Sequence, residues 1–358
     1  MVNRWTAAPI AIMLLAIVGY PAPSRAAEEE ATKESLPAEQ AAPASGDQTP
    51  GSGRPPGMPG GGGGGPPGFG GPPGYDATWY PSRPVTGQST DFGFVRQGVK
   101  IGAPIWKEGG DIVIANVSVR NTLFFTDAIL PDTQRPFPEQ LWDINLSMNY
   151  MHRFENGWSG GLTVGIGSPS DRPFASIDEI NATLMGFLRV PARNERDAWT
   201  FGLLYMSGGA VDFPFPIIAY AWNHSERFNM NIGIPFSLMW KPADDLTVNL
   251  SYLPLMTINA RLTWQADEKM QIFGGYQYLN ETYFLADRTI RTDRYFVFEQ
   301  RLITGVSYEL TRNASAELNG GYSFGRYFGE GDSQWGALTD QVNVDPGAFV
   351  GLRVKLLF

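Results

Sequence analysis

The chain has 358 residues, among them 42 glycines, 28 prolines, two histidines and no cysteine. Without cysteine there is no disulfide framework and no thiolate metal site, and two histidines are too few for a multi-histidine metal centre. The 27 basic and 36 acidic side chains give a formal net charge of -9. This balance argues against nucleic acid as a partner, because binding to nucleic acid needs a basic face.

Residues 1–26 have the three parts of a secretory signal peptide. Arg4 supplies the positive charge near the start, residues 7–20 are uncharged and mostly apolar, and Ser24-Arg25-Ala26 places small residues before a cleavage site that follows Ala26. The apolar run is about 14 residues long, shorter than the roughly 20 residues of a spanning helix. We therefore expect residues 1–26 to direct export and to be removed.

Residues 27–88 are expected to form a disordered, Pro/Gly-rich periplasmic segment. Residues 51–75 include 13 glycines and 7 prolines, which leaves too little apolar surface to offset the entropy lost on ordering. Tracts of this composition form flexible or semi-extended linkers. The composition changes near residue 90, so we expect one folded domain over residues 89–358.

The folded part alternates between apolar and polar residues with a period of two, which indicates β-strands. In the stretch Leu141–Met151, Asn145, Ser147 and Asn149 share one face, and the opposite face is apolar from Trp142 to Tyr150. The polar face is uncharged for the most part and the apolar face ends in aromatic residues, as in strands that face lipid on one side. The same alternation occurs at 158–167, 229–240, 246–252, 258–264, 314–324 and 350–358.

Short polar turns alternate with long connections, which is the pattern of outer-membrane barrels. We expect turns at 108–110, 155–157, 193–197, 266–269 and 311–313, and long loops at 125–140, 168–180, 207–216, 286–294 and 327–346. The sequence thus predicts an all-β, transmembrane, antiparallel up-and-down β-barrel of about 12–14 strands, at roughly 20 residues per strand and connection. Residues 229–265 leave the number open, because their prolines allow two long strands or four short ones. A soluble secreted β-sandwich is the alternative fold.

The chain ends in the segment 350–358, with Val350, Leu352, Val354, Leu356 and Phe358 on one apolar face. This segment resembles the closing strand of bacterial outer-membrane β-barrels. The chain as a whole, including the stretch 231–235, is similar to an uncharacterised family of such barrels described as a domain of unknown function and porin- or transporter-like. The resemblance implies that Phe358 is a signal for the barrel-assembly machinery. It implies no catalytic residue.

No catalytic, cofactor-binding or metal site is expected. Membrane-embedded hydrolases use a histidine with a serine or an acidic partner, and neither His152 nor His224 lies in an evident acid–base pair in the sequence. We therefore expect no enzyme. The arginines of residues 286–294 could bind lipopolysaccharide phosphates, although a solvated loop is the simpler interpretation.

The leading functional hypothesis is a passive channel or solute-uptake barrel in the bacterial outer membrane, with a small solute, membrane lipid, lipopolysaccharide and the assembly machinery as partners. Few bulky aromatic residues are expected on the inner face, which favours an open lumen. Inward basic residues could favour anions, or could form ordinary salt bridges with Asp and Glu. The alternative function is a structural or adhesive surface protein. The lumen-facing candidates are Asn145, Ser147, Asn149, Thr163, Asn249, Arg261, Glu317, Arg353 and Lys355.

Overall fold

The computed structural model describes residues 72–194, 196–209 and 213–356, all within one compact unit, Pro55–Phe358. Strands make up most of this part of the chain, and none of its helices is long and apolar enough to cross a membrane. The elements are β1 (Gly74–Pro84), β2 (Asp91–Glu108), β3 (Asp111–Thr126), β4 (Gln140–Arg153), β5 (Ser159–Ser170), the 3-10 helix η1 (Ile177–Glu179), β6 (Asn181–Pro191), β7 (Ala198–Met206), β8 (Phe215–Ser225), β9 (Phe228–Ile234), β10 (Phe236–Ala243), β11 (Leu246–Leu253), β12 (Thr257–Gln265), β13 (Met270–Tyr283), β14 (Arg294–Thr311), β15 (Ala314–Gly331), β16 (Thr339–Val344) and β17 (Gly347–Leu356).

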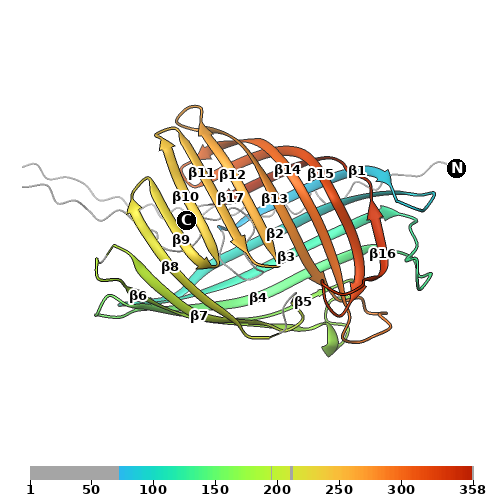
Figure 1. Ribbon diagram of the computed structural model, residues 1–358, viewed down its shortest axis with the longest axis horizontal. Helices are drawn as coiled ribbons and strands as arrows, with labels where there is room; N and C mark the ends of the chain where they lie inside the picture. The colour runs from blue at the N-terminus through green and yellow to red at the C-terminus, as the bar shows by residue number, and fades with distance from the viewer. Residues whose placement is uncertain (1–71, 195, 210–212, 357–358) are drawn as a thin grey trace, which may run out of the picture. The chain divides into compact units, whose positions relative to one another are not determined.

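The strands form one closed antiparallel barrel (Figure 1). Each pairs with its neighbour in sequence from β1 to β15, and β1 closes the ring by pairing with both β2 and β17. β16 pairs with the last residues of β15 and β17 with the earlier ones, so these two strands share one position in the ring. The described strands therefore occupy sixteen positions. The predicted all-β, up-and-down barrel is confirmed.

The strand number of 12–14 was too low for two reasons. β9 to β12 are only 7 to 9 residues long, so residues 229–265 contain the four short strands rather than two long ones. Pro235, which has no N–H to donate, lies in the β9–β10 hairpin. Leu238 pairs with Met230 across that turn, so the apolar residues of both strands lie on the same face. The apolar–polar alternation therefore continues through the turn, which hides the turn in the sequence.

The other reason is β1, which lies inside the range 27–88 that we expected to be disordered. Gly74–Pro84 forms a strand, and this corrects the boundary at residue 89. Hydrogen bonding to two strands supplies the order that its own composition does not predict. The predicted signal peptide and residues 27–71 lie outside the described residues, as does Phe358. The expected loop 327–346 is also shorter, because β15 extends to Gly331 and β16 begins at Thr339.

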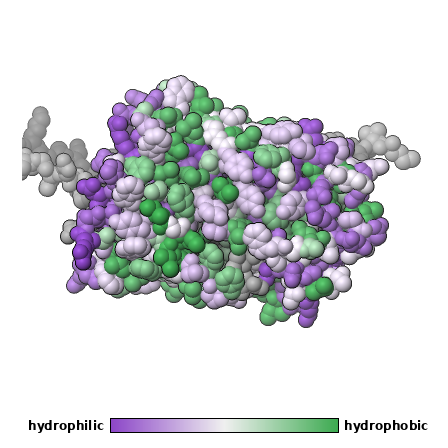
Figure 2. Space-filling view, in the orientation of Figure 1, coloured by the Kyte–Doolittle hydropathy of each residue, from purple (hydrophilic) through white to green (hydrophobic). Residues whose placement is uncertain are grey.

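The outer surface has the character of a lipid-facing wall. On β4 and β5 the outward side chains Leu146, Met148 and Val164 are about half exposed, whereas the inward neighbour Asn145 is buried. Figure 2 shows hydrophobic residues over the middle of the visible face and dense hydrophilic residues at its left edge. Aromatic residues surround the end of the barrel that carries the short turns, as in the girdles of outer-membrane barrels. We call this end the turn end and these residues the aromatic girdle. The exposed members of the girdle are Trp106, Tyr150, Trp158, Trp199, Trp222, Trp240, Trp264 and Tyr308.

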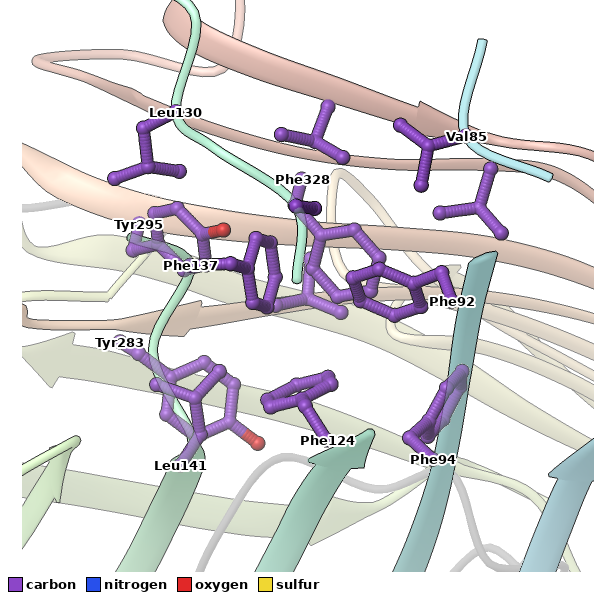
Figure 3. Packing of buried hydrophobic residues seen from close by; sticks show 14 of the residues in the cluster. Val85, Phe92, Phe94, Phe124, Leu130, Phe137, Leu141, Tyr283, Tyr295 and Phe328 are labelled. Atoms are coloured by element: carbon purple, nitrogen blue, oxygen red, sulfur yellow. The ribbon is translucent and has the colours of Figure 1, made fainter. Parts of the chain in front are cut away.

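The long loops lie at the opposite end of the barrel, which we call the loop end. It contains a buried aromatic core. Phe92 and Tyr295 are fully buried, and Phe137 of the β3–β4 loop lies between Tyr295 and Phe328 (Figure 3). This finding corrects the expectation of few inward aromatics. A sixteen-strand barrel can enclose an aqueous channel, but this core fills part of its interior. The aromatic core comprises Tyr80, Val85, Phe92, Phe94, Phe124, Ala128, Leu130, Phe137, Leu141, Tyr283, Leu285, Tyr295, Val297, Phe328, Val342, Val344 and Phe349.

Candidate functional site

The small polar residues expected inside the barrel lie on its inner face. Asn145 and Ser147 on β4 are each 3% exposed, Thr163 on β5 is buried, and Asn149 and Asn249 are half-buried. Among the described residues, the amide nitrogen Nδ2 of Asn145 and the hydroxyl Oγ of Ser147 have no hydrogen-bond partner. Buried polar atoms without protein partners commonly bind ordered water. This wall of the lumen is therefore suited to water, and a role for these residues in solute passage stays a prediction.

Glu317 is the centre of a second group of predicted residues, which we call the Glu317 cluster: Arg261, Glu317, Arg353 and Lys355. Arg261 on β12 donates to Glu317 on β15 over 3.0 Å. Its guanidinium also stacks on Phe273, 3.4 Å from the ring centroid. Because β13 and β14 separate β12 from β15 in the ring, these side chains meet inside the barrel.

The other two cations are held more loosely. Arg353 and Lys355 on β17 lie 3.7 and 3.8 Å from the carboxylate oxygens of Glu317, distances longer than a normal hydrogen bond. Their side chains remain 26% and 25% exposed, whereas that of Glu317 is 3% exposed. The inward basic residues thus form salt bridges, in which three cations share one carboxylate, and a preference for anions stays a prediction.

A larger ion cluster joins β13 to β2 and β3 inside the barrel, next to the aromatic core on the side of the short turns. Glu281 on β13 binds Arg96 on β2 over 3.2 Å and Arg120 on β3 over 2.5 Å. Glu299 accepts a hydrogen bond of 3.1 Å from Tyr80. The side chains of Arg96 and Glu299 are 9% and 2% exposed, and charges buried this deeply persist only when paired and hydrogen-bonded. These pairs could not be predicted from the sequence, because their partners lie on strands that are far apart in the chain.

The barrel is also bridged across its loop end. Phe284, just after β13, donates its backbone N–H to the carbonyl of Pro169 on β5 over 2.8 Å, and its own carbonyl accepts from Asp171. β5 and β13 are eight positions apart in the ring of sixteen, and are therefore diametrically opposite. We call this contact the mouth bridge. It separates the aromatic core on β1–β4 and β13–β17 from the inner walls of β6–β12.

Gly208 in the β7–β8 loop makes room for the mouth bridge. Its φ of +72° lies in the left-handed region that favours glycine, and a Cβ at this position would lie 2.4 Å from the ring of Phe284. The Asp171 carboxylate accepts from the backbone N–H of Ala286 over 2.8 Å. Burial raises the pKa of Asp171 above its usual range, and this hydrogen bond opposes that rise.

The arginines of the loop 284–293 are mostly engaged within the protein. The Arg288 side chain is 4% exposed and donates to the carbonyls of Leu285 and Asp178. Arg291 binds the Asp178 carboxylate over 2.8 Å and is otherwise exposed. The expectation of a solvated loop is therefore wrong for Arg288. Binding of lipopolysaccharide stays a prediction.

The β3–β4 loop, which contributes Phe137 to the aromatic core, is fastened to β16 by a buried carboxylate. Asp340 accepts hydrogen bonds from the backbone N–H groups of Asp132 and Thr133 and from the Thr133 hydroxyl, over 2.6 to 2.9 Å. Arg135 binds Asp340 and Glu330 as well. These contacts hold the loop over the interior of the barrel.

A second apolar region lies on the inner walls of β7 and β8. Leu204 and Met206 are buried and point inward, since Phe201 and Leu203 on the same strand are exposed. We call the cavity beside them the apolar pocket; its lining residues are Leu204, Met206, Phe215, Leu253, Pro254 and Met256. The apolar pocket was not predicted from the sequence. A signal was present, because methionines occupy inward positions on strands whose inward residues are expected to be polar.

His152 does have an acidic partner, which corrects the expectation from the sequence. Its Nδ1 lies 2.5 Å from Asp111, and Tyr150 donates to the same carboxylate over 2.7 Å. The group is on the outer face, beside the aromatic girdle of the turn end. This position suits a structural tie between β3 and β4 at the membrane interface.

The sequence matches the family model of a domain of unknown function, DUF6268, over residues 131–352. No curated protein matches the chain. The chain is also similar to two solved structures at low sequence identity. An outer membrane channel from Pseudomonas putida F1 has 8% identity and a TM-score of 0.35, and covers 80% of this chain and 96% of its own. The beta domain of the Bordetella autotransporter BrkA has 9% identity and a TM-score of 0.28, and the match covers 80% of this chain and 100% of that domain.

Proposed function

We propose that this chain, which belongs to the DUF6268 family, is a solute-uptake barrel of the bacterial outer membrane with a narrow, water-lined path. The observation that carries the proposal is the polar inner wall of β3 and β4. Asn116, Asn145 and Ser147 are buried there with polar atoms that have no partner in the described part of the chain. A barrel with only a structural role would gain stability from apolar or fully paired side chains at these positions.

The aromatic core makes this proposal different from a general porin. It closes the interior beside the long strands β2, β3, β14 and β15, which have 16 to 18 residues against the 9–11 that span a bilayer. At the loop end a path for solute therefore has to pass on the β6–β12 side of the mouth bridge. Beyond the aromatic core, nearer the short turns, it meets the polar wall of β3 and β4. We expect small conductance and a selective preference among solutes.

Reconstitution tests the proposal. Purified full-length protein in planar bilayers should give discrete conductance steps smaller than those of an open sixteen-strand porin, and proteoliposomes should admit arabinose. A barrel that gives no steps and excludes arabinose would contradict the channel function.

A structural or adhesive surface protein is the second candidate. The packed loop end favours it, because the aromatic core, Asp340 and Arg288 hold the loops rigidly, and Ile177 and Trp335 are exposed there. Binding of intact, expressing cells to surfaces or host proteins, with no conductance by the purified barrel, would support this candidate over the first.

A further inference from the structure

The inner wall of the β6–β12 side has apolar residues near the loop end, where a water-filled lumen would normally be polar. Met185, Leu204, Met206 and Ile217 form a buried cluster, and Phe187, Phe215 and Met256 pack against it. Beside it is the apolar pocket. Methionine side chains are flexible and polarizable, so they adapt to apolar groups of different shapes. This wall is therefore suited to contact with an apolar part of a solute.

β12 leads from the apolar pocket to the Glu317 cluster. Met256 directly precedes β12, and the inward residues that follow are Thr257, Asn259 and Arg261. Thr257 and Asn259 are 8% and 7% exposed. At about 3.3 Å per residue, Arg261 lies roughly 16 Å along the strand from Met256. One strand thus presents apolar, then neutral polar, then cationic side chains to the lumen.

The Glu317 cluster has more positive than negative charge. Arg261, Arg353 and Lys355 share Glu317, and Asp76, the cross-strand neighbour of Arg353 on β1, is a further carboxylate on this wall. Arg353 and Lys355 are partly exposed and are not within hydrogen-bond distance of Glu317. Their donors are therefore accessible to an anion in the lumen, where charged side chains determine ion preference.

We propose that amphipathic organic anions enter the lumen on the β6–β12 side of the mouth bridge and then reach the Glu317 cluster, which lies nearer the short turns. The apolar body contacts the partly exposed Phe215 and Met256, and the carboxylate, sulfonate or phosphate group is drawn to Arg353 and Lys355. The inference rests on the proposed channel function and adds the solute class to it.

Three probes in proteoliposomes separate the parts of this proposal. Naphthalene-2-sulfonate has both an apolar body and an anionic group, methanesulfonate has only the anionic group, and arabinose has neither. We expect wild-type protein to admit naphthalene-2-sulfonate faster than methanesulfonate, although it is the larger ion. The double variant Arg353→Gln/Lys355→Gln should slow both sulfonates about tenfold, which corresponds to about 1.4 kcal/mol, and should leave arabinose unchanged.

The double variant Phe215→Asn/Met256→Asn should slow naphthalene-2-sulfonate and leave methanesulfonate unchanged. Lys107→Gln and Ile290→Asn are matched controls, because both residues are exposed and lie outside the path. Heat-modifiable migration of each variant in gels verifies that it is folded. Entry of arabinose without any preference among the sulfonates would overturn the solute class and leave the channel function standing. Exclusion of all three probes would overturn both proposals.

Discussion

Phe284 and Pro169 are joined by a backbone hydrogen bond of 2.8 Å although their strands face each other across the barrel. Up-and-down barrels place hydrogen bonds between adjacent strands, so a bond across the diameter divides the mouth. The aromatic core lies on one side of this bond, and the apolar pocket lies on the other. The division makes the loop end asymmetric, and it is open to direct tests.

Gly208→Val should disrupt the mouth bridge. The new side chain would meet the ring of Phe284, and valine is strained at a φ of +72°. We expect larger conductance steps in planar bilayers and a lower melting temperature. Gly186→Ala is the matched control, because nothing lies within 4 Å of a Cβ placed at Gly186. Unchanged conductance in folded Gly208→Val protein would show that the bridge does not restrict the path.

Asp340→Ala should release the β3–β4 loop. The change removes the acceptor of the Asp132 and Thr133 hydrogen bonds and leaves Arg135 without one of its carboxylates. Each lost hydrogen bond to the ionised carboxylate is worth about 1.5–3 kcal/mol, while Arg135 keeps Glu330 and Asp287 as partners. Trypsin added to intact cells should then cleave at Arg135 faster than in wild type. Asp332→Ala, at an exposed position in a neighbouring loop, should leave the cleavage rate unchanged, and equal rates for all three proteins would contradict the anchoring role.

Leu146→Arg should impair assembly far more than Asn149→Arg. Leu146 is 51% exposed on the outer face, where arginine at the bilayer midplane costs about 2–4 kcal/mol. Asn149 is on the inner face of the same strand and half-buried, so a charge there can remain hydrated. The amount of heat-modifiable protein in outer-membrane fractions measures the difference. Equal losses would mean that the two faces are reversed.

Asp197 should make the β6–β7 turn sensitive to acid. Hydrogen bonds from Asn194, Tyr220 and the backbone N–H of Asn223 lower the pKa of Asp197. A lowered pKa in the folded state means that the stabilisation is present above the unfolded value and is lost as the pH falls through the folded value. The melting temperature of Asp197→Ala should therefore be below that of wild type at pH 7, and the gap should narrow toward pH 3. A gap independent of pH would argue that the ionised carboxylate contributes nothing.

Deletion of residues 27–71 should leave an assembled barrel, whereas deletion of residues 27–88 should not. The longer deletion removes β1, which hydrogen-bonds to β2 and β17 and closes the ring. An open barrel would expose unpaired backbone groups to lipid, which costs several kcal/mol for each group. Heat-modifiable migration and protease resistance of the two proteins measure the outcome. Equal assembly of both would contradict the assignment of β1 to the barrel.

The sequence by itself determined the fold class, the positions of most short turns and the face of most side chains. Because lipid lies outside the barrel and its interior is polar, apolar and polar side chains alternate along each strand. Leu146 and Asn145 can therefore be assigned to opposite faces from their neighbours alone. The inward cations Arg261 and Arg353 were also identified in this way. Where both faces of a strand are covered, the rule fails, as in the buried run Tyr295–Phe298 at the start of β14.

Only the tertiary structure decided what lies inside the barrel. Arg120 meets Glu281, and Phe284 meets Pro169, because a closed ring brings distant strands face to face. The alternation along one strand carries no information about the strand across the lumen. The ring size depended in turn on hydrogen-bonded closure through β1, which no local pattern near Gly74 revealed. The path that we infer for amphipathic anions follows from those long-range contacts.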